Sequence, residues 1–188
     1  MFGMRARSPF CERKKAMLSY ASDNKTDQRN AALVRHQRNP HLRMVYLDAP
    51  DAGATFHFRA AGVPSDLLVP VNFDPEDAAE ITRRTGVPCV YADIDVYLAT
   101  LETDSCSIVW LDYTKTTVKK DVLKDALRVA PFVSVTVSLR GTDHLEEIGK
   151  MAKALGGGID KCEKYKGASI FNMGYILVYR RVGVEVAA

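Results

Sequence analysis

The sequence lacks any hydrophobic run long enough to cross a membrane, since no stretch approaches the roughly 18 to 20 apolar residues that a spanning helix needs. Residues 1–10 contain arginines but no apolar stretch behind them, which is not the pattern of a secretory signal peptide. We therefore predict a protein that is neither inserted in a membrane nor secreted, and we expect it in the cytoplasm or the nucleus.

Metal-binding and disulfide motifs are also missing. None of the four cysteines or four histidines forms a Cys-x-x-Cys or His-Glu-x-x-His pattern. We interpret the cysteines as reduced thiols in an intracellular protein and predict no bound metal. The residues concerned are Cys11, Cys89, Cys106, Cys162, His36, His41, His57 and His144.

The glycine motifs that bind nucleotide phosphates are absent as well. Neither Gly-x-Gly-x-x-Gly nor Gly-x-x-x-x-Gly-Lys-Ser/Thr occurs, and the serine-hydrolase pattern Gly-x-Ser-x-Gly is missing. The glycine run at 156–158 follows a predicted helix instead of preceding one, so we interpret it as a helix end. The sequence therefore carries no common dehydrogenase, NTPase or serine-hydrolase signature.

The composition is that of a globular domain with an uneven charge distribution. The chain has 188 residues, of which 47% are hydrophobic and 26% charged, and this length fits a single domain. Residues 1–43 hold ten Lys/Arg and three acidic residues, a net charge of +7, whereas the remainder carries −4. We predict a basic N-terminal extension over 1–43 and an α/β domain over 44–188. The extension is either a solvated lead-in or an arm that binds nucleic acid through its phosphates.

From residue 44 onward, short apolar runs alternate with helical patterns, which is typical of βαβ units and a parallel sheet. The run at 107–111 is apolar throughout, so we expect a central strand that is buried on both faces. Only two residues separate the last two predicted strands, and a connection that short requires an antiparallel hairpin. The predicted strands are 44–47, 67–71, 88–91, 107–111, 132–139, 169–172 and 175–181; the predicted helices include 75–85, 117–129 and 144–155.

Acidic or amide side chains follow the first four predicted strands. They are Asp48 and Asp51, Asn72 and Asp74, Asp93 and Asp95, and Asp112. Ligands of open parallel sheets bind at the carboxyl ends of the strands, so a ligand with hydroxyl groups, an amino group or a positive centre would suit this edge. The alternative is that these residues cap the following helices, which explains Asp74 and Asp95 well.

The order of elements and the residues at the strand ends resemble those of the class I S-adenosylmethionine-dependent methyltransferases over residues 44–183. The resemblance implies a three-layer Rossmann-like sandwich. Its seven-stranded mixed sheet would have the order 3-2-1-4-5-7-6 and a C-terminal antiparallel hairpin.

The resemblance also implies S-adenosylmethionine as cofactor and a role for each strand end. In the family, the first turn passes the amino acid part of the cofactor, the second strand end binds the ribose, the third contacts the adenine, and the fourth faces the methyl donor and acceptor. The matching residues are, in strand order, Asp48, Ala49, Pro50 and Gly53; Asn72 and Asp74; Asp93 and Ile94; and Asp112 and Tyr113.

Two motifs depart from the family pattern. The family usually has three glycines in the first turn, where this chain has Pro50, Ala52 and Ala54. Glycine serves there because the backbone turns tightly and approaches the ligand without a Cβ. The chain also lacks the Asp/Asn/Ser-Pro-Pro-aromatic signature of the enzymes that methylate amino groups of bases, because Asp112-Tyr113-Thr114-Lys115 stands in its place.

We therefore predict methyl transfer from S-adenosylmethionine, with nucleic acid as the acceptor because of the basic segment 1–43. One alternative is a methyltransferase-like scaffold that has lost catalysis and holds nucleic acid or a partner through the same segment. Another is a different nucleotide or nucleoside ligand at the same edge. The sequence makes no prediction about the oligomeric state.

Overall fold

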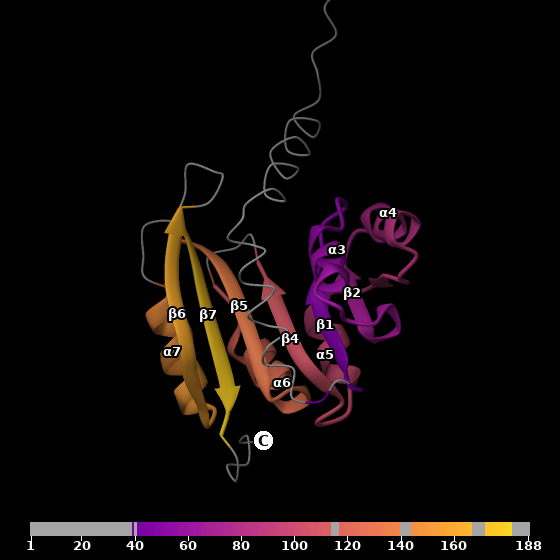
Figure 1. Cartoon of the computed structure of the whole chain (residues 1–188). Coiled ribbons are helices and arrows are strands. Elements are labelled where there is room, and N and C mark those ends of the chain that lie inside the picture. Colours follow the sequence, from indigo (N-terminus) through magenta and orange to yellow (C-terminus); the bar gives the residue numbers. More distant parts are fainter. Residues whose placement is uncertain (1–38, 40, 114–116, 140–143, 167–171, 182–188) are drawn as a thin grey trace, which may run out of the picture.

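The computed structural model describes residues 39, 41–113, 117–139, 144–166 and 172–181 (Figure 1). Its elements in chain order are β1 (Arg43–Leu47), α3 (Gly53–Ala60), the 3-10 helix η1 (Ser65–Leu67), β2 (Leu68–Asn72), α4 (Pro75–Thr85), β3 (Val90–Tyr91), α5 (Ile94–Thr100), β4 (Cys106–Asp112), α6 (Lys120–Val129), β5 (Phe132–Leu139), α7 (His144–Ala154), β6 (Gly157–Lys166) and β7 (Asn172–Arg180).

The strands form one seven-stranded sheet in the order β3-β2-β1-β4-β5-β7-β6. The first five strands in the chain are parallel to one another, and β7 is antiparallel to both β5 and β6. This order and the C-terminal antiparallel hairpin confirm the predicted fold.

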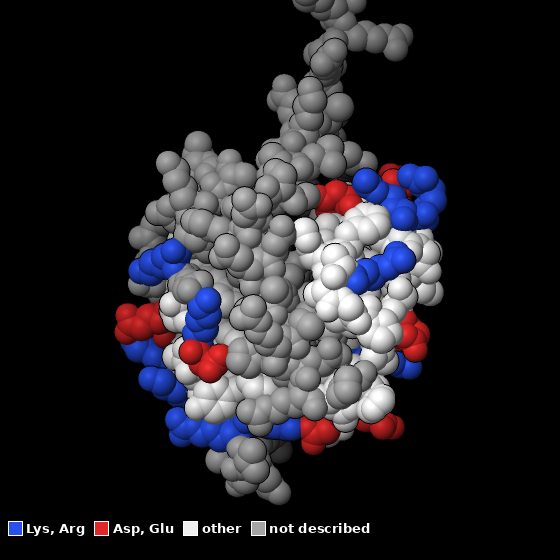
Figure 2. All heavy atoms as spheres, viewed as in Figure 1, with Lys and Arg blue, Asp and Glu red and all other residues white. Residues whose placement is uncertain are grey.

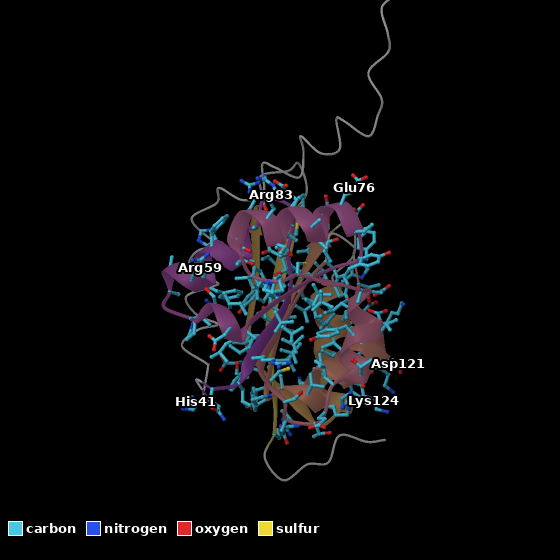
Figure 3. All side chains as sticks on the ribbon, turned by 90° about the vertical axis from the view of Figure 1, so that its right-hand side faces the viewer. His41, Arg59, Glu76, Arg83, Asp121 and Lys124 are labelled. Carbon is cyan, nitrogen blue, oxygen red and sulfur yellow. The ribbon has the colours of Figure 1, made fainter. Side chains whose placement is uncertain are left out.

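The helices of the described residues cover the two faces of the sheet unequally (Figure 1). The larger apolar cluster packs α5, α6 and α7 against one face, for example through Leu123 and Leu127 against Val133 and Val135. The smaller cluster lies on the other face, below α3. In the view of Figure 2, the described surface on the right is mostly uncharged, with Lys or Arg side chains both within it and at its margin. Figure 3 shows the layers from the side, with Arg59 of α3 and Asp121 of α6 on opposite sides of the sheet.

Local sequence signals explain the bounds of α4. Asp74 is the N-cap and accepts hydrogen bonds from the backbone of Glu76 and Asp77, and Pro75 occupies the first helical position. Gly86 ends the helix with a φ of 70°, a left-handed conformation that glycine adopts at little cost. The prediction for 75–85 is therefore confirmed.

The first predicted strand of the hairpin, 169–172, was wrong, whereas the second, 175–181, overlaps β7. Residues 169–171 of the first predicted strand lie outside the described residues, while β6 occupies Gly157–Lys166 and so includes two glycines that we interpreted as a helix end. The predicted turn residues Met173 and Gly174 instead belong to β7. An edge strand pairs on one side only and tolerates the charged residues of this segment, which is why β6 resembles a loop in sequence.

Other differences concern the ends of elements. Residues 117–119 precede α6 without helical structure. β3 begins at Val90 because Pro88 has no backbone N–H and the N–H of Cys89 donates to Thr82 Oγ1 instead of to a strand. The domain division at 43/44 remains a prediction, although β1 begins at Arg43.

No helix in the described part of the chain is long and apolar enough to cross a membrane. Among the same residues, no group of three or more His, Cys, Asp or Glu side chains could hold a metal ion.

Candidate functional site

The carboxyl ends of the parallel strands β1 to β4 lie at one edge of the sheet, and the predicted site residues follow these ends. Backbone hydrogen bonds hold neighbouring ends together, because Asp48 N donates to Val71 O and Ala92 N donates to Asn72 O. The structure therefore brings the first three strand ends side by side. The end of β4 is adjacent to β1 in the sheet.

The first turn, which follows β1, is tight although it contains few glycines. Ala52 N donates to Ala49 O over 2.7 Å, and Ala52 has a left-handed backbone with a φ of 57°. Ala52 is fully buried, so it adds no exposed side chain to the turn. Pro50 is half-buried, and its carbonyl accepts a hydrogen bond from Arg84 of α4. The residue that stands in place of the second glycine of the family motif, Ala52, is therefore buried and not exposed on the turn.

Asp48 at the end of β1 is the anchor of this turn. Its Oδ1 accepts from the backbone N–H groups of Ala49 and Ala54 at 3.0 and 3.3 Å. Its Oδ2 accepts from the backbone N–H and the hydroxyl of Thr55 at 3.1 and 2.6 Å. A carboxylate has about four acceptor positions, and these four donors occupy them. Asp48 therefore acts on the first turn of α3 from within the protein.

A second buried hydroxyl extends this network. The Tyr46 hydroxyl lies 2.8 Å from Thr55 Oγ1. Since Thr55 has one hydroxyl proton and directs it to Asp48, Tyr46 is the donor in this contact. Burial raises the pKa of Asp48 to about 6, and the hydrogen bonds from Thr55, Ala49 and Ala54 limit that rise. Burial also raises the pKa of Tyr46, so its phenol stays protonated.

Asn72 and Asp74 connect the ends of β1 and β2. Asn72 donates from Nδ2 to the backbone carbonyl of Asp48 at 2.8 Å and accepts from Asp74 N at 2.8 Å. Asp74 uses Oδ1 alone to cap α4, and among the described residues no group donates to its Oδ2. Of the two residues predicted at the ribose position, Asp74 has a carboxylate oxygen available for a ligand, whereas both amide atoms of Asn72 are engaged.

The residues after β3 divide into exposed and buried positions. Asp93 is exposed and caps α5 by accepting from Asp95 N at 3.1 Å. Ile94 is buried in the larger apolar cluster, so its side chain contributes to the core and not to the surface of the edge.

Tyr113 connects the end of β4 to the start of α5. Its hydroxyl donates to Asp95 Oδ1 at 3.3 Å, and Lys119 Nζ lies 2.7 Å from Asp95 Oδ2. Burial and the Asp95 carboxylate raise the pKa of Tyr113. Asp112 is exposed at the last position of β4. The two residues predicted at this strand end therefore differ, since Tyr113 is half-buried and bonded to Asp95 whereas Asp112 is exposed.

Exposed aromatic residues at this edge were not predicted. Phe73 lies between Asn72 and Asp74 and is 76% exposed, and Tyr91 at the end of β3 is 64% exposed. In the described ranges, the other exposed large hydrophobic residues are Phe56 and Val96, which lie in the first four residues of α3 and α5. In the sequence, these positions could have been found as aromatic residues at the end of a predicted strand or directly after it. Since Asn72 pairs with Tyr91, Phe73 and Tyr91 place exposed apolar surface at the neighbouring ends of β2 and β3.

No family model matches the sequence, and no curated protein matches it. Solved structures do match. Magnesium protoporphyrin IX methyltransferase from Synechocystis, with bound S-adenosylmethionine, is 12% identical with a TM-score of 0.66, and the match covers 94% of this chain and 86% of that one. A putative RNA methyltransferase from Pyrococcus horikoshii is 12% identical with a TM-score of 0.64, covering 88% and 87%.

The chain has the class I methyltransferase fold. The sheet order and these matches agree on this point. The same fold also occurs in the cyclase SpnF, which is 11% identical with a TM-score of 0.60 over 84% of this chain and 82% of that one. The fold therefore leaves the reaction to be argued from the site.

Proposed function

We propose that this protein binds S-adenosylmethionine at the carboxyl edge of β1, β2 and β3 and transfers its methyl group to an acceptor near the end of β4. The observation that carries the proposal is the tight first turn, in which Ala52 has the left-handed backbone conformation that glycine usually supplies. Because Ala52 is buried, it adds no exposed side chain to the turn that a ligand would approach.

The residues at the edge fit the parts of this cofactor. Asp74 Oδ2 is an acceptor for a ribose hydroxyl, and the exposed rings of Phe73 and Tyr91 offer apolar surface to the adenine. Asp93 remains the candidate for the adenine amino group, and the backbone of Ala49, Pro50 and Gly53 the candidate for the amino acid part. Asp48, Asn72 and Ile94 would support these residues from behind, since Asp48 and Asn72 are engaged within the protein and Ile94 is buried.

Bound S-adenosylmethionine supplies an activated methyl group on its sulfonium, so the protein has mainly to position donor and acceptor. Asp112 is the side chain proposed to orient the acceptor, because it is exposed at the end of β4. Tyr113 would maintain the position of this strand end through Asp95.

Nucleic acid remains the proposed acceptor. The support is the +7 charge of residues 1–43, which would bind phosphates. The described edge itself carries several carboxylates, so a polyanion would have to be held by this basic segment.

Isothermal titration with S-adenosylmethionine and S-adenosylhomocysteine tests the cofactor, and two substitutions of Asp74 separate binding from helix capping. Asp74→Asn keeps a capping side chain but removes the carboxylate, whereas Asp74→Ala removes both. We expect Asp74→Asn to retain the stability of the protein and to lose about tenfold in affinity, equivalent to about 1.4 kcal/mol. Asp66→Asn, an exposed change in η1, is the matched control and should bind like the wild type.

Absence of binding at millimolar ligand would overturn the proposal and favour the scaffold alternative. Binding that is equally strong in Asp74→Asn would contradict the ribose role of this carboxylate.

A further inference from the structure

The outer face of α3 carries an aromatic and a basic side chain together. Phe56 is 42% exposed, and Arg59 and Ala60, three and four residues further along the helix, are exposed as well. Residues at these spacings share one face of a helix. In Figure 3, Arg59 lies on the side of the sheet away from Asp121. The outer face of α3 therefore presents an aromatic ring and a guanidinium group to solvent.

Two hydrogen bonds join α3 and the turn before it to the C-terminal turn of α4. Arg59 Nη1 donates to the carbonyl of Thr85 at 2.9 Å, and Arg84 Nη1 donates to the carbonyl of Pro50 at 3.2 Å. Arg83 and Arg84 are both exposed in this last turn of α4. The two helices thus form one continuous surface, which we call the α3–α4 surface and define by Phe56, Arg59, Arg83 and Arg84.

The positive charge of the α3–α4 surface is only partly neutralised. Arg83 pairs with Glu80 through two hydrogen bonds of 2.7 and 2.8 Å. Arg59 and Arg84 bond to backbone carbonyls, and among the described residues neither forms an ion pair with a carboxylate. A guanidinium group has five N–H donors, so each of these two arginines keeps donors for a further acceptor. Three arginines and one glutamate leave a net charge of +2.

We propose that the α3–α4 surface binds a single-stranded nucleic acid, with phosphates on Arg59 and Arg84 and an unpaired base on Phe56. The inference rests on the proposed function, because it says where the nucleic-acid acceptor is held. Guanidinium groups bind phosphate oxygens through paired N–H donors. Exposed aromatic rings stack on the bases of single strands. An acidic peptide or a duplex would satisfy the arginines, but neither offers an unstacked base to Phe56.

The position of the surface suits an acceptor. Arg84 reaches the carbonyl of Pro50, in the turn proposed to receive the amino acid part of the cofactor. The carboxylates that would repel phosphates follow β2, β3 and β4, as with Asp74, Asp93 and Asp112. A strand bound by the α3–α4 surface would therefore lie beside the proposed site without crossing these carboxylates, with the basic segment 1–43 as a second source of positive charge.

Fluorescence anisotropy of the full-length protein with a labelled single-stranded RNA of about 12 nucleotides, without cofactor, tests the phosphate contacts. We expect Arg59→Gln to reduce the dependence of log K on log salt concentration by about 0.7, the value for one phosphate contact on a single strand. Arg59→Lys keeps the charge and should retain the dependence. The matched control, Lys153→Gln, removes an exposed cation from the last turn of α7 and should change neither affinity nor salt dependence.

Phe56→Ser tests the base contact in the same assay. We expect it to weaken RNA binding about fivefold or more while the salt dependence stays unchanged, because stacking on a base involves no phosphate. Val96→Ser, which also replaces an exposed apolar residue near the start of a helix, is the control. A duplex of the same sequence should bind with no dependence on Phe56, because its bases are already stacked.

Titration of the same variants with S-adenosylmethionine separates this inference from the proposed function. Arg59→Gln and Phe56→Ser should bind the cofactor like the wild type, and far-UV circular dichroism would verify their folding. Equal salt dependence in Arg59→Gln and Lys153→Gln, or equal RNA affinity in Phe56→Ser and Val96→Ser, would overturn the α3–α4 surface even if the cofactor binds. Failure of the wild type to bind the cofactor would overturn methyl transfer, and the RNA measurements would still decide whether this surface binds nucleic acid.

Discussion

At the scale of single residues, Asp48 shows how one side chain can have a role other than the obvious one. The sequence places an acid at the end of β1, where the family resemblance implies contact with the cofactor. In the structure its two carboxylate oxygens accept four hydrogen bonds, from the backbone N–H groups of Ala49, Ala54 and Thr55 and from the Thr55 hydroxyl. The carboxylate therefore shapes the turn that a ligand would approach, and its effect on binding would be indirect.

The raised pKa of Asp48 predicts a pH dependence of stability with a definite sign. Because burial raises the pKa to about 6 in the folded state, the folded protein binds this proton more tightly than the unfolded chain does. The contribution of Asp48 to the free energy of unfolding is thus largest below about pH 4 and is lost as the pH rises through about 6.

Urea unfolding of the wild type and of Asp48→Asn at several pH values between about 4 and 8 measures this contribution. We expect the wild type to lose roughly 3 kcal/mol relative to the variant over this range, with little change above about pH 7. The comparison removes the titration of all other groups, which the two proteins share. A difference that is constant or grows with pH would contradict the assignment.

At the scale of elements, the packing of α7 on β7 depends on a glycine that the sequence suggested was part of a turn. A Cβ at Gly174 would lie 2.8 Å from Cγ, Cδ1 and Cδ2 of Leu145. Leu145 is 2% exposed, so its side chain has little room to move. The absence of a side chain at Gly174 is what allows the helix to approach the strand this closely.

Gly174→Ala is therefore expected to destabilise the protein by about 1–3 kcal/mol, measured by urea unfolding, through overpacking against Leu145. Leu145→Ala alone leaves a cavity and should cost about 2–5 kcal/mol. In the double variant the new methyl group occupies space that Leu145 has vacated, so the cost should be at least about 0.5 kcal/mol below the sum. Additive costs would show that the two positions do not interact.

At the scale of the whole molecule, acidic and basic side chains lie at opposite ends of the helices α4, α6 and α7. Acidic residues occupy first turns, as with Glu76 and Asp77 in α4, and basic residues occupy last turns, as with Arg83 and Arg84. The same holds for α6 and α7. Because each helix after a parallel strand starts at the carboxyl edge, the acids accumulate there together with Asp74, Asp93 and Asp112.

The acidic residues at the carboxyl edge predict that salt affects the affinity for S-adenosylmethionine more than the affinity for S-adenosylhomocysteine. S-adenosylmethionine carries one net positive charge near neutral pH, whereas S-adenosylhomocysteine carries none. Raising the salt concentration from about 0.05 to 0.5 M should weaken binding of the charged form roughly fivefold, or about 1 kcal/mol, because the carboxylates become screened. Titration of both ligands at both salt concentrations measures this, with the uncharged form as the control. Equal salt dependence would contradict an electrostatic contribution from this edge.

The sequence by itself determined the features that depend on short-range interactions and on hydrophobic periodicity. Asp74, Pro75 and Gly86 set the bounds of α4 locally, and the apolar run at 107–111 identified β4 as a buried central strand. The βα alternation, together with the family resemblance, was sufficient for the sheet order. Helix caps and apolar runs depend only on residues a few positions apart. The sheet order follows from the way strands and helices are usually connected.

The tertiary structure alone decided the partners that come from distant parts of the chain. The hydroxyl of Tyr113 meets Asp95, and the amide of Asn72 meets the carbonyl of Asp48, 18 and 24 residues away. The edge strand β6 was likewise hidden, because a strand paired on one side needs no continuous apolar pattern. Such contacts depend on how strands and helices are placed in space, and the periodicity of a single segment carries no record of that placement.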